Sequence, residues 1–267
     1  MKLPKLSKNA ILYSVIILVA IITIWAVCYF MSSSKKRKAM IIVEPREHKN
    51  LAPVIKNFNT VMPAEWDMYV FHGKSTGQFA LNASVGVEEK RRLFLVPLHV
   101  DNLTADTYNE LFKDPTFWNQ IDAETIFVFQ TDAALCANSP RNIEEFTKYD
   151  YIGCSVDNTR FGKNVFWNND KETTYFYGVG GLSLRSKSFT LKCIADKPEI
   201  DKYYPEDVFY SNCVAMSPNK PENAVVMSRF CSQNRYMDDS FGVHKPGIKD
   251  KAEKARLFAY CPEAKAL

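Results

Sequence analysis

Short apolar runs alternate with segments of helical spacing between residues 40 and 129. Four of these runs are expected to be strands: residues 40–43, 68–71, 93–100 and 126–129. Pro97 is expected at a sheet edge or at a bulge, because it has no N–H to donate. Parallel neighbouring strands need long crossover connections, which are usually helices. The rhythm therefore predicts an α/β fold with a Rossmann-like, mostly parallel sheet flanked by helices.

Two helices are expected between these strands. The first begins after Asn50, where apolar residues recur every three or four positions. The second follows Thr104, whose side chain is of a helix-capping type, and carries Tyr108, Leu111 and Phe112 on one face. Both apolar faces are expected to cover the sheet.

Beyond residue 145 the pattern is less regular. Residues 149–154 are expected to form a strand, and residues 161–174 are Asn-rich and turn-like. Residues 175–184 are interpreted as two strand pieces around glycines. The Lys-, Ala- and Glu-rich residues 249–256 are expected to form a terminal helix.

The amino-terminal segment favours a membrane anchor. Residues 10–31 are almost wholly apolar and uncharged, and as a helix they would extend roughly 33 Å, enough to cross a bilayer. A secretory signal peptide is the competing interpretation, but its apolar region usually has only ~7–15 residues and ends at small residues. Here the run ends in Tyr29, Phe30 and Met31, so a retained signal-anchor is the favoured prediction.

One folded domain is expected, because 267 residues with 46% hydrophobic and 24% charged content can fill one substantial core. The predicted parts are a short polar tail at residues 1–9, a transmembrane anchor at 10–31, a basic juxtamembrane linker at 32–39, a globular domain at 40–248 and a carboxyl-terminal tail at 249–267.

Charge separates the anchor region from the rest of the chain. The first 40 residues hold seven Lys and Arg residues and no acid, so in a chain of net charge +4 the remainder carries −3. A mildly acidic domain argues against a nucleic-acid partner, because phosphate binding needs a clustered basic face. The basic run at residues 35–38 suits anionic lipid headgroups, although a solvated linker would look the same. Flanking charge alone would leave the large domain in the cytoplasm.

Cysteines and sequons bear on the compartment without deciding it. Six cysteines lie outside the apolar run and none forms a Cys-x-x-Cys pair, which argues against a metal cluster. An even number permits disulfides in an oxidising compartment, but buried thiols in a reducing one give the same pattern. Asn82-Ala83-Ser84 and Asn102-Leu103-Thr104 are glycosylation sequons, a pattern that also arises by chance.

Polar residues follow three of the predicted strands. Glu44 and Arg46 come after the first, His72 after the second, and Gln130 and Asp132 after the fourth. Ligands of open parallel sheets collect beyond the carboxyl ends of the strands. These side chains are therefore predicted to bind substrate or metal. A surface ion pair between Arg46 and a neighbouring glutamate, and a helix cap at Asp132, are the alternatives.

Four motifs together resemble a little-characterised family of GT-A-type glycosyltransferases, which depend on sugar nucleotides. They are Gln130-Thr131-Asp132, the glycine-rich residues 178–185, Pro205-Glu206-Asp207-Val208 and Phe241-Gly242-Val243-His244. The similarity extends to residues 42–46 and 66–73, and so to nearly everything after residue 40. It implies a GT-A-like catalytic domain, a nucleotide-sugar donor, and an acceptor glycan, protein or lipid of unknown identity. It also favours a Golgi or endoplasmic-reticulum enzyme with a lumenal catalytic domain, with a cytoplasmic-facing domain as the alternative.

The resemblance implies a metal site. Asp132 stands where related enzymes use Asp-x-Asp to hold a divalent ion against the nucleotide diphosphate, and here Gln130 replaces the first acid. One carboxylate can serve, because Mg²⁺ or Mn²⁺ usually keeps water and phosphate oxygens among its ligands. His244 matches a late histidine that completes such sites. A metal-independent site and an ordinary surface histidine are the alternatives.

The resemblance also implies the catalytic groups. Gly180 and Gly181 would let backbone approach the sugar closely, although a simple turn between two strands would explain them as well. Asp207 is predicted as the general base that deprotonates the acceptor hydroxyl, with Glu206 binding acceptor or sharing that role. Both acids also suit the first turn of any helix.

These expectations combine into one hypothesis, a membrane-anchored glycosyltransferase that inverts the sugar carbon in a single displacement. Retention of configuration stays open. A membrane-tethered scaffold that binds nucleotide sugar or glycan without turnover is the alternative, and Gln130 in place of an acid is consistent with it. A serine hydrolase is disfavoured, because the chain has no Gly-x-Ser-x-Gly motif.

Overall fold

The computed structural model describes residues 17–21, 23, 37–155, 165–166, 173–174, 176–196, 204–234 and 236–267. The chain divides into two units, Met1–Arg37 and Lys38–Leu267. In the first unit, residues 17–21 and 23 are helical. Within the described residues, no helix has the length and apolar character needed to cross a membrane. Most of the predicted anchor at residues 10–31 lies outside the described residues, so the anchor stays a prediction.

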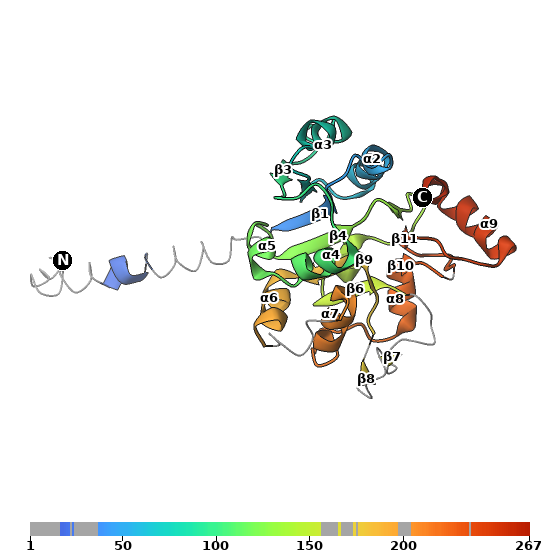
Figure 1. Cartoon of the computed structure of the whole chain (residues 1–267). Coiled ribbons are helices and arrows are strands. Elements are labelled where there is room, and N and C mark those ends of the chain that lie inside the picture. The colour runs from blue at the N-terminus through green and yellow to red at the C-terminus, as the bar shows by residue number, and fades with distance from the viewer. Residues whose placement is uncertain are drawn as a thin grey trace, which may run out of the picture. The chain divides into compact units, whose positions relative to one another are not determined.

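Six strands form the main sheet of the second unit, in the order β3-β2-β1-β4-β9-β6 (Figure 1). They are β1 (Lys38–Glu44), β2 (Trp66–His72), β3 (Leu93–Pro97), β4 (Thr125–Phe129), β6 (Tyr151–Cys154) and β9 (Val179–Ser186). β1 pairs in parallel with β2 and β4, and β2 with β3. β9 runs antiparallel to β4 and β6. The sheet is mixed but mainly parallel, which confirms the predicted α/β class.

Helices cover both faces of this sheet (Figure 1). They are α2 (Leu51–Val61), α3 (Gly77–Ala83), α4 (Ala105–Phe112), α5 (Pro115–Asn119), α6 (Lys187–Asp196), α7 (Glu206–Val214), α8 (Ala224–Phe230) and α9 (Lys251–Tyr260), with 3₁₀ turns at Ile143–Phe146 and Pro262–Ala266. Two further short strands, β7 (Val165–Phe166) and β8 (Thr173–Thr174), pair antiparallel with each other.

Side chains of β1 alternate between two cores. Met40 and Ile42 pack with residues of α2 and α8, whereas Ala39, Ile41 and Val43 pack with residues of α4 and α5. Successive side chains of a strand point to opposite faces, so a strand covered on both sides must be apolar at nearly every position. Burial on both faces of the sheet therefore explains why the strands appear in the sequence as unbroken apolar runs.

The predicted helix starts are confirmed where a capping residue marks them. The Thr104 side chain accepts from the Thr107 N–H at 3.2 Å and begins α4. Pro205 precedes α7, whose first turn holds Glu206 and Asp207. Thr104 thus satisfies an N–H that has no partner within α4, whereas Pro205 caps no N–H of α7 and the Asp207 carboxylate accepts from the Val208 N–H instead.

Two expectations for the glycine-rich region and for Asp132 are wrong. Residues 179–186 form one strand, β9, where two pieces around a turn were expected. The pairing of β9 with β6 changes register between Gly153 and Cys154, so the glycines lie in an irregular stretch of a strand. After Asp132 comes a strand, β5 (Ala133–Leu135), which rules out the helix-cap alternative.

A second, three-stranded sheet has the order β10-β11-β5, with β10 at Cys231–Ser232 and β11 at Gly242–His244. Two disulfides reinforce it. Cys136–Cys261 joins the end of β5 to the end of α9, and Cys154–Cys231 joins β6 to β10. Disulfides of this kind persist in oxidising compartments, so the pair is a hint of a location outside the cytoplasm.

Candidate active site

A small hollow opens beyond the carboxyl ends of β1 and β4. Its volume is about 180 Å³. Its walls come from both strand ends and from α4: Val43, Glu44, Pro45, Arg46, Leu103, Tyr108, Gln130, Thr131 and Asp132. The structure therefore brings together Glu44, Arg46, Gln130 and Asp132, which the sequence placed after two different strands.

The second sheet carries His244 to Asp132. β5 begins directly after Asp132 and pairs antiparallel with β11, so that Ala133 lies opposite His244. The Lys245 N–H donates to the Asp132 carbonyl at 2.8 Å and extends this pairing by one residue. Two side chains distant in sequence lie side by side because of strand register.

The His244 imidazole is buried and held at both nitrogens. Nδ1 lies 3.1 Å from Gln233 Oε1, and because this oxygen can only accept, Nδ1 carries a proton. Nε2 lies 3.2 Å from Asp132 Oδ1 and 3.3 Å from Gln130 Oε1. In the neutral ring the Nε2 lone pair therefore faces these two oxygens. Nε2, Asp132 Oδ1 and Gln130 Oε1 thus lie close together, and all three are atoms of the kind that bind a cation.

Asp132 is poised as a ligand. Its Oδ1 is buried and has no hydrogen-bond partner among the described residues. Burial raises the pKa of Asp132, but His244, a backbone N–H and Lys245 together lower it by more, so the pKa lies below that of an ordinary aspartate. The carboxylate is therefore ionised at neutral pH. No group of three or more His, Cys, Asp or Glu side chains suited to a metal occurs in the described part of the chain.

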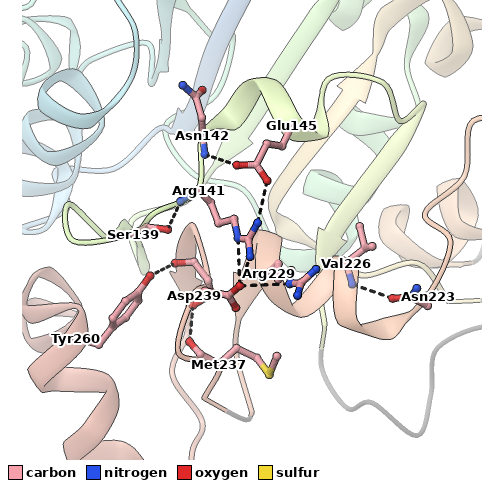
Figure 2. A network of polar contacts seen from close by, with 11 residues as sticks. Ser139, Arg141, Asn142, Glu145, Asn223, Val226, Arg229, Met237, Asp239 and Tyr260 are labelled. Carbon is pink, nitrogen blue, oxygen red and sulfur yellow. Dashed lines mark hydrogen bonds and ion pairs between the residues drawn. The ribbon is translucent and has the colours of Figure 1, made fainter.

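A polar network holds the segment that leads into β11 (Figure 2). Asp239 Oδ2 lies 3.1 Å from Arg141 Nε and 3.3 Å from Arg229 Nε. The Tyr260 hydroxyl donates to the Ser240 carbonyl at 2.9 Å. These contacts tie residues 237–240 to the loop after β5, to α8 and to α9. The network therefore anchors the segment that precedes β11, the strand that ends at His244.

Gly180 and Gly181 lie between two groups of polar side chains. A Cβ at Gly181 would lie 2.2 Å from His244 Nε2 and 2.6 Å from Gln130 Oε1. A Cβ at Gly180 would lie 1.6 Å from Glu206 Oε1. Side chains at either position would collide with these groups, so the two glycines are needed for close approach. They join the Asp132 side of the site to the Glu206 side.

Glu206 forms a buried ion pair with Arg185 of β9. Arg185 Nη2 lies 2.7 Å from Glu206 Oε2, and the two side chains are 0% and 6% exposed. The guanidinium also lies 4.9–5.5 Å from the centroids of four aromatic rings, those of Phe112, Trp118, Tyr151 and Tyr210. Burial raises the pKa of Glu206 to about 7, although Arg185 acts to lower it.

Asp207 follows Glu206 and is only half-buried. Its Oδ1 accepts from the Val208 N–H at 2.8 Å, and the Gly180 N–H also hydrogen-bonds to it. Burial raises the pKa of Asp207, and these N–H donors offset only part of the rise. A carboxylate with a raised pKa accepts a proton more readily than an ordinary aspartate. Of the two acids, Asp207 is the more accessible.

Glu44 and Arg46 bind each other at the rim of the hollow. Arg46 Nε and Nη2 donate to the two oxygens of Glu44 at 2.8 and 2.9 Å. The ion-pair alternative for Arg46 is therefore correct. Because the Arg46 side chain is still 56% exposed, it can also present its guanidinium to a ligand.

His72 does not join the site. It is buried at the end of β2, its Nδ1 lies 2.7 Å from the Gly73 carbonyl, and it does not line the hollow. The prediction that His72 binds substrate has no support from its position. His72 does end the second strand, as predicted. Its ring, however, lies against Gly77 at the start of α3 and not against the residues of the hollow.

Sequence reasoning missed three groups that complete the site. Tyr108 was assigned only to the apolar face of a helix, yet it also lines the hollow. Arg185 closes the glycine-rich motif and was given no role from the sequence, yet it forms the ion pair with Glu206. Gln233, which orients His244, gave no signal in the sequence. The Asn-rich residues 161–174 lie outside the described residues except at 165–166 and 173–174.

A larger groove adjoins the hollow. Its volume is about 530 Å³, and Leu103 lines both spaces. The groove runs along the outer side of α4, from the residues after β3 to α5. Its polar lining includes Glu110, Asp114 and Gln120 but no Lys or Arg.

Comparison with known proteins gives one finding. A family model described as "Protein of unknown function (DUF5672)" matches residues 96–244. That stretch is more than half of the chain and contains Gln130, Asp132, Glu206, Asp207 and His244. No curated protein matches the sequence.

Proposed function

The chain belongs to the DUF5672 family of proteins of unknown function, and from the geometry of its site we propose that it is a glycosyltransferase. It would move a sugar from a nucleotide-diphosphate donor to an acceptor hydroxyl, with inversion at the sugar carbon. The mainly parallel sheet with a single antiparallel strand supports a GT-A-like domain.

One observation carries the proposal. Gly180 lies against Glu206 and hydrogen-bonds to Asp207 through its N–H, and the next residue, Gly181, lies against His244 and Gln130, the candidate cation-binding groups. Transfer from a nucleotide sugar needs both functions at once, because a base must activate the acceptor while the departing diphosphate is neutralised. The arrangement supplies a candidate for each.

The proposed chemistry is a single displacement. Asp207 accepts the proton of the acceptor hydroxyl as that oxygen bonds to the anomeric carbon. The bond from this carbon to the phosphate oxygen breaks, and its electron pair leaves with the nucleoside diphosphate. Glu206, held by Arg185, lies next to Asp207 at the start of α7, and neither acid is among the residues that line the hollow.

The residues fit a divalent cation. Asp132 Oδ1 lacks a hydrogen-bond partner among the described residues, and a carboxylate, an imidazole and an amide oxygen suit Mn²⁺ or Mg²⁺. Asp132 and His244 would hold the ion, with Gln130 beside them. When bound, such an ion neutralises the charge that develops on the leaving diphosphate.

The donor needs more room than the hollow offers. Small-molecule sites usually enclose ~300–1,000 Å³, and the hollow has about 180 Å³. The adjoining groove supplies the rest. Because its lining has acids and no Lys or Arg, it suits the uncharged nucleoside better than the phosphates.

The two disulfides, the two sequons and the apolar run at residues 10–31 support a membrane-anchored protein with its domain outside the cytoplasm. Both sequon asparagines, Asn82 and Asn102, are exposed, as attachment of a glycan requires. A Golgi or endoplasmic-reticulum lumen is the proposed location.

A donor screen tests the proposed function. Thermal unfolding would be followed with uridine, guanosine and cytidine nucleotide sugars, each with and without Mn²⁺. A true donor at about 100 times its Kd adds roughly 2.7 kcal/mol to the free energy of unfolding, so one nucleotide class should raise the melting temperature in a Mn²⁺-dependent way. No shift with any of these ligands would overturn the proposal.

Gly181→Ala is expected to weaken Mn²⁺ binding by roughly 10- to 100-fold, the usual effect of disturbing a group that orients a metal ligand. The added methyl would occupy the place of His244 Nε2 and push the ring away. Titration of Mn²⁺ into the purified chain measures the effect. Gly247→Ala, where the methyl would meet Asn234 Oδ1 at 3.0 Å, is the control. Equal affinities in all three proteins would remove His244 from the metal site.

A further inference from the structure

Tyr108 presents one polar atom to the hollow. Its ring stacks on Phe112 with a centroid distance of 4.4 Å and packs against the core beneath α4. It lines the same hollow as Gln130 and Asp132. Packing therefore fixes the ring, and the hydroxyl is the one side-chain group of Tyr108 that can hydrogen-bond to a ligand.

The Gln130 side chain ends in an amide, which has a carbonyl oxygen that accepts and an NH₂ group that donates. Its Oε1 faces the proposed cation position, 3.3 Å from the unprotonated His244 Nε2, so its amide NH₂ is the group that hydrogen-bonds to the Tyr108 hydroxyl. An aspartate or glutamate could not do this, because an ionised carboxylate only accepts. The amide at position 130 thus links the cation side of the site to Tyr108.

The hydroxyl of Tyr108 keeps its own proton for another acceptor. It accepts from Gln130, so its O–H bond remains available for donation. Burial and the nearby Glu206 raise the pKa of Tyr108 well above its usual value, and the phenol stays protonated at neutral pH. The hydroxyl is therefore a fixed donor in a site whose other side chains are mostly acceptors.

We propose that Tyr108 is a binding residue for the diphosphate of the donor. Its hydroxyl donates a hydrogen bond to a phosphate oxygen in the hollow, and Gln130 is the positioning residue that turns the hydroxyl toward it. This inference rests on the proposed function. It also explains why Gln130 stands where an acid was expected, because an amide can offer its oxygen to the cation and its NH₂ to the Tyr108 hydroxyl, whereas an ionised carboxylate has no proton to donate.

Tyr108→Phe tests the inference, because it removes only the hydroxyl and keeps the stack on Phe112. Binding of uridine diphosphate and guanosine diphosphate, each with Mn²⁺, would be measured by calorimetry on the full chain. A hydrogen bond to a charged group contributes ~1.5–3 kcal/mol, which corresponds to roughly a 10- to 100-fold loss of affinity for the diphosphate that binds. Tyr69→Phe is the matched control, since Tyr69 is a buried, stacked tyrosine of the same core that does not line the hollow.

A second variant, Gln130→Met, completes a double-mutant cycle. If Gln130 acts by positioning Tyr108, its effect on diphosphate affinity should be smaller in the Tyr108→Phe background than in the wild type. Additive effects would overturn the positioning role. This variant also tests the inference if Tyr108→Phe does not fold, because an unchanged affinity in Gln130→Met would then contradict it.

Binding measurements on the wild type test the proposed glycosyltransferase function, and comparison with the Tyr108→Phe variant tests the role of Tyr108. Wild-type protein that binds neither diphosphate overturns both. Wild-type binding with an equal affinity in Tyr108→Phe overturns the inference alone. A Tyr108→Phe variant with unchanged affinity but a shifted pH profile of turnover would mean that the hydroxyl serves Glu206, and this too contradicts the assignment.

Discussion

Asp207→Asn is expected to lower donor turnover by roughly 10²- to 10⁴-fold, the usual contribution of general-base catalysis. An asparagine keeps an oxygen that can accept from the Val208 N–H, so α7 should still form. Donor affinity should stay close to that of the wild type, since the base acts on the acceptor. Hydrolysis of the nucleotide sugar identified by the donor screen, with water as acceptor, measures the loss.

The matched control is Asp106→Asn, because Asp106 is also an acid in the first turn of a helix and does not line the hollow. The wild type should lose activity as the pH falls through the raised pKa of Asp207, at a higher pH than an ordinary aspartate would give. Turnover that survives in Asp207→Asn would exclude this residue as base. A wild type that binds donor without any turnover would favour the scaffold alternative.

Arg185→Met is expected to destabilise the fold by about 3–5 kcal/mol, because it leaves the Glu206 carboxylate buried without its partner. For a chain of this size, each kcal/mol corresponds to roughly 2–4 °C in melting temperature, so a fall of about 10 °C should be seen. Thermal unfolding followed by circular dichroism is the measurement. An unchanged melting temperature would mean that the ion pair contributes little.

The pH dependence identifies the cause of the loss. Without Arg185 the pKa of Glu206 should rise above its present value of about 7, whereas the unfolded value is near 4.3. A folded pKa above the unfolded one means that stability falls as pH rises from about 4.3 through the folded pKa. The destabilisation should therefore be small at pH 4 and large at pH 8. In Arg185→Met/Glu206→Gln this slope should disappear.

The parallel part of the fold could be predicted because its strands and helix starts are marked by residues that are close together in the sequence. A strand such as β1 is buried on both faces and is therefore apolar throughout, and Thr104 marks a helix start by its own chemistry. The antiparallel strand β9 could not be predicted as one continuous strand. Gly180 and Gly181 look like a turn in the sequence, but they are required by contacts with Glu206 and His244 that lie far along the chain.

The candidate site could be predicted only as a set of residue types. Gln130 and Asp132 follow a strand, and the structure places them in one hollow. The neighbour of Asp132 could not be found, because it depends on the register of β5 with β11, and β5 has only three residues. The role of Tyr108 was equally hidden, since its ring satisfies the helix pattern by itself while its hydroxyl meets a residue of another strand.

The pairing of Ala133 with His244 also orders events during synthesis. The strand that carries Asp132 leaves the ribosome more than a hundred residues before the histidine that completes the pair. A domain generally folds as a unit, so both the pocket and the core of the main sheet are completed only when the last fifth of the polypeptide has been made. A chain that stopped before α8 would therefore lack Met227 and Phe230 of the main core as well as the imidazole.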